Sequence, residues 1–162
     1  MRSIGLAFLA LVVLLLVVSG CDSPPWSRIV VANSSNSNIT VRFYTEVVSL
    51  HFPYLYTPEE WRADQHFSSG TPKDRFTINE ADHYFEAELV PGAAVEIDRA
   101  PYPDVEENIP NNFVIYRLEI RGPSGDVSVV GKNEVFHEFK KEGGGPFWFI
   151  RGKSPRYVYY YN

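Results

Sequence analysis

The sequence contains very little sulfur and no strongly basic segment. Its 162 residues include one Cys and one Met, and 15 Lys and Arg face 20 Asp and Glu, which gives a formal net charge of −5. A single Cys cannot form an internal disulfide, so non-covalent packing must hold the chain together. A mildly acidic chain without a basic block argues against nucleic acid as a partner.

The sequence also lacks the motifs of common hydrolases and of nucleotide-binding enzymes. No Gly-x-Ser-x-Gly occurs, and Gly-Pro-Ser-Gly at 122–125 fits a hairpin turn better than a nucleophile. The glycines at 143–145 precede Pro146 and lack the Lys-Ser/Thr pair that holds phosphate. None of the four His has the H-x-x-x-H spacing of many zinc sites. We therefore assign no catalytic residue, no metal ligand and no cofactor.

One alternative stays open, namely an enzyme or metal-binding protein whose site is assembled from distant residues. Its first candidates are His66, His83, Asp64 and Glu60. Two His side chains that converge in a cleft, or stoichiometric zinc in the purified protein, would favour this alternative. Histidines scattered over the surface are the simpler interpretation of the same residues.

The first twenty residues differ from the rest of the chain. Residues 6–18 form an unbroken apolar run of thirteen. A membrane-spanning helix needs about twenty such residues, whereas a shorter run is typical of a signal-peptide core. Arg2 precedes the run and small residues follow it, as in secretory signals. Residues 18–21, Val-Ser-Gly-Cys, then resemble the lipobox of bacterial lipoproteins, in which one aliphatic and two small residues precede an invariant Cys.

This resemblance implies that the signal is cleaved before Cys21 and that Cys21 carries the acyl chains. Two or three acyl chains make a stable membrane anchor, whereas a single chain is marginal. Lipidation also gives the lone Cys a role, because a free exposed thiol is unusual in an exported protein. The resemblance covers residues 1–21 alone. It implies a location in the bacterial cell envelope, anchored to a membrane and facing either the periplasm or the outside.

These features divide the chain into three parts. Residues 1–20 are the cleaved signal peptide, residues 21–28 are the lipidated Cys with a short tether, and residues 29–162 are a single domain. The seven tether residues after the Cys reach at most about 23 Å when fully extended. Two prolines at 24–25 stiffen this tether. We therefore expect the domain to lie close to the membrane surface.

The composition after residue 20 is that of a β-rich domain. This part contains 14 Val, 8 Ile, 10 Phe and 10 Tyr, but only 4 Leu and no Met. β-Branched and aromatic side chains favour strands, and strong helix formers are scarce. We predict a mainly β fold, an antiparallel sandwich (Ig-like) or small barrel of about eight strands, with two short helices.

Apolar runs separated by turn residues predict the strands. The runs pair into four expected hairpins: 28–32 with 39–45, 85–89 with 95–98, 113–121 with 127–130, and 147–150 with 157–161. In the first two pairs, alternation of apolar and polar residues indicates one buried face. The arm 85–89 has a helical alternative, because Ala81, Tyr84 and Phe85 also fit helical spacing, and we favour the strand.

Cap residues predict the two helices. Residues 57–60, Thr-Pro-Glu-Glu, combine a cap, a Pro at the first helical position and a Glu three residues after the cap. They predict a helix from Pro58 to about residue 66. Asn133 is the expected cap of a second helix over 134–142, which Gly143 would end.

Two segments are candidates for contact with a partner. Residues 50–61 are apolar and show no alternation, and their candidate contact residues are Phe52, Tyr54, Tyr56 and Trp61. The second segment is an acidic loop over 98–108, with the candidates Asp104, Glu106 and Glu107. Clustered oxygens can hold calcium, but this loop lacks the D-x-D-x-D-G pattern of calcium loops.

These observations favour a lipid-anchored, non-catalytic domain that binds or scaffolds another component of the cell envelope. Its expected partners are the membrane, through Cys21, and an envelope protein of unknown identity. We expect no nucleic acid among its partners.

Overall fold

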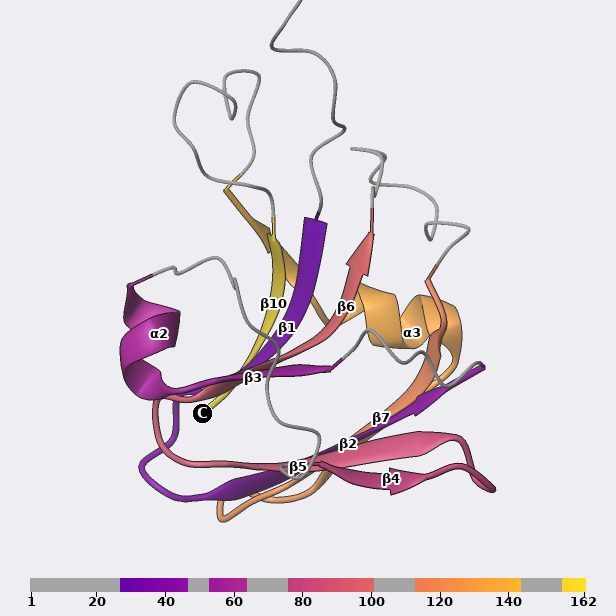
Figure 1. Ribbon diagram of the computed structural model, residues 1–162, viewed down its shortest axis with the longest axis horizontal. Coiled ribbons are helices and arrows are strands. Elements are labelled where there is room, and N and C mark those ends of the chain that lie inside the picture. The colour runs from indigo at the N-terminus through magenta and orange to yellow at the C-terminus, as the bar shows by residue number, and fades with distance from the viewer. Residues whose placement is uncertain (1–26, 47–52, 64–75, 101–112, 144–155) are drawn as a thin grey trace, which may run out of the picture.

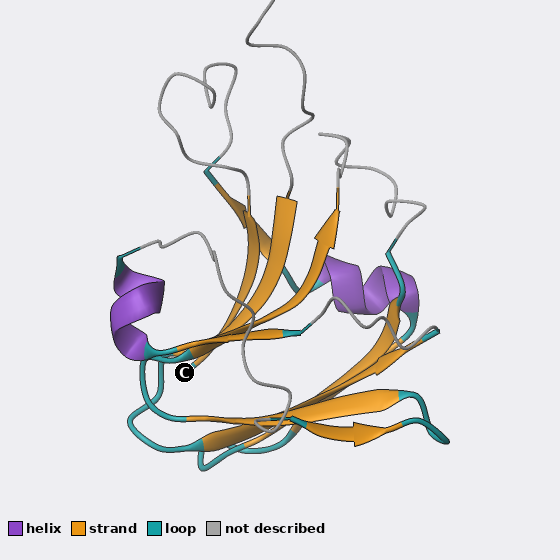
Figure 2. Cartoon of the chain, in the orientation of Figure 1, coloured by secondary structure: helices purple, strands orange, loops and turns teal. Residues whose placement is uncertain are grey.

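β-Strands dominate the computed structural model, which describes residues 27–46, 53–63, 76–100, 113–143 and 156–162 (Figure 1). Within these residues, ten strands form two five-stranded sheets and two short helices accompany them. The two sheets stack on each other and do not close into a barrel (Figure 2). The prediction of a mainly β sandwich with two short helices is therefore confirmed, and the barrel alternative is wrong.

Sheet A has the strand order β3-β6-β1-β10-β9. Its strands are β1 (Ser27–Asn33), β3 (Tyr54–Tyr56), β6 (Ala94–Ala100), β9 (Lys140–Glu142) and β10 (Arg156–Tyr161). The central pair β1–β10 is parallel, and the other pairs are antiparallel. Every residue of β1 is buried, as expected for a strand covered on both faces.

Sheet B has the order β4-β5-β2-β7-β8 and is antiparallel throughout. Its strands are β2 (Ile39–Thr45), β4 (Thr77–Asn79), β5 (Tyr84–Leu89), β7 (Ile115–Arg121) and β8 (Val127–Val130). In β2 the apolar residues are buried and the residues between them are partly exposed, as the alternation predicts. Sheet B therefore has one core face and one solvent face.

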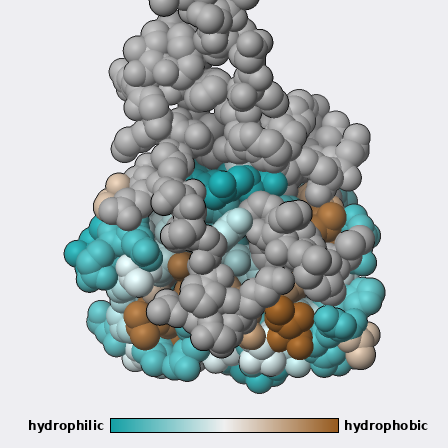
Figure 3. All heavy atoms as spheres, in the orientation of Figure 1, coloured by the Kyte–Doolittle hydropathy of each residue, from teal (hydrophilic) through white to brown (hydrophobic). Residues whose placement is uncertain are grey.

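The core lies between the two sheets. Alternate residues of the central strands point into it from both sides, and both aliphatic and aromatic side chains fill the space. Phe43 and Phe85, on neighbouring strands of sheet B, stack with ring centroids 5.4 Å apart. Figure 3 shows hydrophobic patches in the lower middle of this face of the molecule and mostly hydrophilic residues along its lower edge.

The pairing predicted for the first two hairpins is wrong. β1 and β2 lie in different sheets, and so do β5 and β6. Instead, β2 pairs with β5 and β1 pairs with β6, so both connections cross from one sheet to the other. Alternating apolar residues point into the same core whether two strands are neighbours in one sheet or lie in opposite sheets. The alternation therefore does not decide which strands pair. The strand preferred over a helix for residues 85–89 is confirmed.

The third hairpin is confirmed, because β7 and β8 pair directly and Gly125 donates its N–H to the carbonyl of Gly122 at 3.1 Å. The first arm of the last predicted hairpin, residues 147–150, lies outside the described residues. Its second arm is β10, which pairs with β1 and β9. Among the described residues, no helix has the length and hydrophobicity needed to span a membrane.

Helix α2 (Pro58–Arg62) begins where the sequence predicts and ends earlier. Its capping box is complete: Glu60 donates its N–H to Thr57 Oγ1, and Thr57 donates its N–H to Glu60 Oε2 at 2.8 Å. The helix ends at Arg62, with Ala63 as the C-terminal cap, and the predicted end near residue 66 is therefore wrong.

Helix α3 (Lys132–His137) overlaps the predicted helix over 134–142, but both of its predicted ends are wrong. Gly131 occupies the cap position in place of Asn133. Residues 140–142 form β9, which pairs with β10 at the edge of sheet A. Lys140 and Lys141 thus lie on an edge strand, where lysine discourages pairing with another chain.

Candidate functional site

Three of the four predicted aromatic contact residues lie on the outer face of sheet A. Tyr54 and Tyr56 come from β3, and Trp61 comes from α2, which packs over this face. Tyr56 is 1% exposed, and Tyr54 and Trp61 are partly buried. Tyr56 therefore cannot belong to an exposed patch. Of the described candidates, only the exposed parts of Tyr54 and Trp61 remain available for contact with a partner. Phe52 lies outside the described residues.

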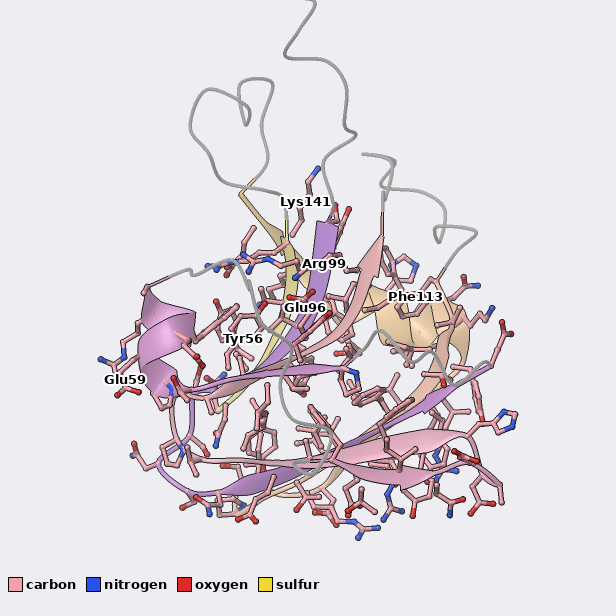
Figure 4. All side chains as sticks on the ribbon, viewed as in Figure 1. Tyr56, Glu59, Glu96, Arg99, Phe113 and Lys141 are labelled. Carbon is pink, nitrogen blue, oxygen red and sulfur yellow. The ribbon has the colours of Figure 1, made fainter. Side chains whose placement is uncertain are left out.

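Tyr56 instead belongs to a buried polar network with Glu96 and Arg99 of β6 (Figure 4). The Tyr56 hydroxyl donates to Glu96 Oε2, and Arg99 Nε donates to Glu96 Oε1 at 2.6 Å. Glu96 is 0% exposed, so both of its oxygens depend on these protein partners. The guanidinium of Arg99 also lies 5.6 Å from the ring centroid of Tyr54.

A second buried arginine adjoins this network. Arg28 of β1 pairs with Arg99 of β6 across the sheet and is 2% exposed. Burial raises the pKa of Tyr56, and the neighbouring Glu96 carboxylate raises it further, while Arg28 opposes the shift. The phenol consequently remains a protonated hydrogen-bond donor at neutral pH and is not a catalytic base. The network thus links side chains of β3 and β6 on the outer face of sheet A.

We expect the free energy of unfolding to fall as the pH rises above about 10, the unperturbed pKa of tyrosine. In this range Tyr56 loses its proton in the unfolded chain and keeps it in the folded one, so the unfolded state binds fewer protons and stability decreases. Urea unfolding at increasing pH should show a shallower decline for Tyr56→Phe. Tyr159 and Tyr160, whose pKa values burial also raises, would account for part of the remaining decline. Equal declines in both proteins would contradict this prediction.

The residues of the enzyme or metal alternative are not brought together where they are described. His83 is exposed in the turn before β5, and Glu60 completes the capping box of α2. Asp64 and His66 lie outside the described residues. In the part of the chain that the structure describes, no group of three His, Cys, Asp or Glu is placed to hold a metal ion.

The remaining predicted site residues cannot be placed. The lipidation candidate Cys21 and the acidic-loop candidates Asp104, Glu106 and Glu107 all lie outside the described residues. The acidic loop predicted over 98–108 is wrong at its start, because residues 98–100 belong to β6 (Ala94–Ala100), and its remaining residues lie outside the described part of the chain. The residues that resemble a lipobox, 18–21, precede β1 and also lie outside the described residues. Both candidate features therefore remain predictions.

The outer face of sheet B carries a surface that the sequence reading did not single out. We call it the tyrosine–arginine surface, and it consists of Arg42, Tyr44, Tyr84, Tyr116 and Arg117. The rings of Tyr44 and Tyr84 lie 5.4 Å apart at an angle of 56°, and those of Tyr44 and Tyr116 lie 6.1 Å apart at 49°. All five side chains are partly exposed.

Both arginines of this surface are held in place. The Arg42 guanidinium lies 4.5 Å from the centroid of Tyr84, and that of Arg117 lies 4.9 Å from the centroid of Tyr44. Arg42 donates from Nε and Nη2 to Glu86 Oε2, at 2.8 and 2.6 Å. Arg117 forms an ion pair with Glu119. Interactions with Tyr44 and then with Glu86 raise the pKa of Arg42, so this guanidinium stays charged.

The sequence contained part of the signal for this surface. The alternation in 39–45 predicts that Arg42 and Tyr44 face away from the core. Tyr84 and Tyr116 belong to other strands, and only the strand register places them beside Tyr44. Tyr84 is the direct partner of Tyr44 on β5, and Arg117, which follows Tyr116, is the partner of Tyr44 on β7. No local pattern predicts these pairings.

Comparisons with protein-family models, with curated proteins and with solved structures found no match to this chain.

Proposed function

We propose that the chain is a lipid-anchored, non-catalytic domain of a bacterial cell envelope that binds a protein partner through the tyrosine–arginine surface. The observation that carries this proposal is the partly exposed group of three tyrosines and two arginines on the outer face of sheet B. Tyrosine and arginine are enriched among the residues that dominate binding energy at protein interfaces. Their concentration on a solvent-facing sheet therefore favours a binding role.

The surface is already ordered before a partner binds. Arg42 is bonded to Glu86 and stacked on Tyr84, and Arg117 is held by Glu119 and Tyr44. Binding usually costs conformational entropy when long side chains become fixed, and a side chain that is already fixed avoids much of this cost. The tyrosines have only two rotatable side-chain bonds and add contact area at low entropic cost.

The ring geometry favours a protein partner over a glycan. Sugars stack on flat, open ring faces, but the arginines cover one face each of Tyr44 and Tyr84. The rings are also tilted by 49° to 56° against their neighbours and do not form a flat platform. Such an arrangement presents ring edges, hydroxyls and guanidinium groups, which suit the mixed polar and apolar surface of a protein.

The anchor and the surface are compatible in position. β1 begins at Ser27, only six positions after the lipidation candidate Cys21. β1 belongs to sheet A, and sheet B lies on the far side of the core from the start of β1 (Figure 1). A domain held close to a membrane by this short tether would leave the outer face of sheet B accessible to a partner.

In-cell crosslinking followed by mass spectrometry tests the proposal. We expect a discrete envelope protein to be captured, and Tyr84→Ala to reduce its capture about fivefold or more, because such residues often contribute over 1 kcal/mol. Thr77→Ala is the matched control, because Thr77 is exposed and pairs with Glu86 on the same sheet. Cys21→Ser should release the chain from the membrane.

Two outcomes would count against the proposal. Capture of the same protein at equal yield by Tyr84→Ala and Thr77→Ala would move the binding site elsewhere. Absence of any captured protein, while the chain remains folded and anchored, would contradict the binding role itself. Retention of Cys21→Ser in the membrane fraction would contradict the lipid anchor and leave the binding surface unaffected.

A further inference from the structure

Among the residues that the structure describes, strand β8 is an edge of sheet B whose sequence lacks the usual protection against pairing with another strand. Its sequence, Val-Ser-Val-Val, contains no charged residue and no proline, and its pairing with β7 shows no bulge. Charges, prolines, bulges and short length are the features that commonly protect edges. Among the described strands, edge strand β9 carries Lys140 and Lys141, and the edges β3 and β4 have three residues each.

The side chains of β8 on the solvent face are open. Val130 is 62% exposed, the highest value among the large hydrophobic residues that the structure describes, and Ser128 is also exposed. Val127 and Val129 face the other way and pack against the core. The strand is thus fixed on its inner face and accessible on its outer face.

The hydrogen bonds to β7 show which backbone groups of β8 face outward. Gly131 donates its N–H to the carbonyl of Tyr116 at 2.8 Å, next to the pair Arg117–Val130. In an antiparallel ladder, alternate residues direct both their N–H and C=O toward the same neighbour. Val129 and Val127 therefore face β7 with Gly131. The N–H and C=O groups of Ser128 and Val130 point away from the sheet.

We propose that this edge pairs with β8 of a second copy of the chain, antiparallel and about a two-fold axis at Val129. In this register Ser128 lies opposite the partner's Val130, and Val130 lies opposite the partner's Ser128. All outward N–H and C=O groups of both strands are then paired, with about four hydrogen bonds in total. A register centred on Ser128 or on Val130 would leave some of these groups unpaired.

The chemistry of the strand suits a copy of itself. No like charges meet across the axis, because β8 carries none. Val129 lies opposite the partner's Val129, and β-branched pairs of this kind are favourable between neighbouring strands. A two-fold axis also keeps the solvent faces of both sheets on the same side. The two tyrosine–arginine surfaces would then lie side by side on one ten-stranded sheet.

An interface of two four-residue strands is small. Stable complexes bury about 1,600 Å² in total, and this edge alone buries less, so the pairing is weak at low concentration. Attachment of both copies to one membrane would raise their effective concentration and favour pairing. This last step rests on the proposed lipid anchor, whereas the pairing register does not.

The full-length chain with Val129→Cys, expressed in its natural envelope and oxidised, tests the register. Directly opposite residues at this type of position have Cα atoms about 4.5 Å apart, which a disulfide can bridge. The matched control is Ser124→Cys, an exposed position in the β7–β8 turn away from the axis. We expect the disulfide-linked dimer to form about tenfold more with Val129→Cys.

Ser128→Pro provides the complementary test. Proline at this position removes an N–H that points away from β7, so the fold should tolerate it on an edge strand while pairing is blocked. In the Val129→Cys background it should reduce the dimer to the level of the Ser124→Cys control. Ser128→Lys, which adds an exposed charge, should have the same effect if the proline variant does not fold.

Equal dimer formation by Val129→Cys and Ser124→Cys would overturn the proposal, as would a dimer that survives both substitutions of Ser128. A disulfide between Val129→Cys and a different envelope protein would assign the edge to that protein and also overturn it. These outcomes are separate from those for the tyrosine–arginine surface, which are measured with Tyr84→Ala.

Discussion

Replacing Glu96 with alanine is expected to lower the free energy of unfolding by about 3–5 kcal/mol, the usual cost of removing one partner from a buried ion pair. The carboxylate is fully buried, and it accepts hydrogen bonds from the Tyr56 hydroxyl and from Arg99 Nε. Its removal takes the acceptor away from the buried Tyr56 hydroxyl and from the partly buried Arg99 guanidinium. Urea unfolding of the full-length chain in detergent micelles would measure the loss.

Glu88→Ala is the matched control for this experiment. Glu88 lies on β5, is exposed, and accepts one hydrogen bond from the Asn38 side chain. Its substitution should change the free energy of unfolding by less than about 0.5 kcal/mol, as for most surface positions. Glu96→Gln keeps the shape but loses the charge, and we expect an intermediate loss. A loss below about 1 kcal/mol for Glu96→Ala would show that the network does not stabilise sheet A.

The sequence predicts the fold class correctly because the fold class depends on local patterns. Alternation over 39–45, the turn at 122–126 and the abundance of β-branched residues are sufficient for a β-sandwich. Strand pairing depends on distant contacts. The alternation of 39–45 fits equally a strand that pairs with β1 and one that faces it across the core. The structure adopts the second arrangement.

The same reason limits prediction of the candidate site. Tyr44, Tyr84 and Tyr116 come from three strands that are separated in sequence and adjacent only in sheet B. Conversely, Tyr56 lies in an apolar segment that the sequence predicts to be exposed. In the structure its buried hydroxyl donates to Glu96, which lies 40 residues later in the chain. A polar partner from a distant strand leaves no trace in the segment where the tyrosine lies.

Asn33 lies at the connection between β1 and β2. It links this connection to the one between β5 and β6, and both pass from one sheet to the other. Its Nδ2 donates to the carbonyl of Ser37 at 2.8 Å and to that of Leu89 at 2.9 Å. Its Oδ1 accepts from the N–H and the hydroxyl of Ser35, at 3.0 and 2.7 Å. All the polar groups of this buried side chain are therefore engaged.

The backbone of Asn33 joins the same two connections. Its N–H donates to the carbonyl of Ala93 at 2.9 Å, and its carbonyl accepts from the N–H of Gly92 at 2.8 Å. Gly92 has a φ of 79°, a conformation that favours glycine, in the turn from β5 to β6. The side chain of Asn33 thus holds its own loop and the end of β5, while its backbone holds the following turn.

Replacing Asn33 with alanine should therefore lower the free energy of unfolding by about 2–4 kcal/mol, because four hydrogen bonds are lost and the buried carbonyl of Leu89 keeps no side-chain donor. Asn33→Asp should be equally damaging, since it directs carboxylate oxygen at two carbonyls. Asn38→Ala, which removes one exposed hydrogen bond in the same loop, should cost less than about 0.5 kcal/mol. Equal urea-unfolding midpoints for the Asn33 and Asn38 variants would contradict this prediction. They would show that packing of β1 and β2 alone fixes the connection between the sheets, without a contribution from the hydrogen bonds of Asn33.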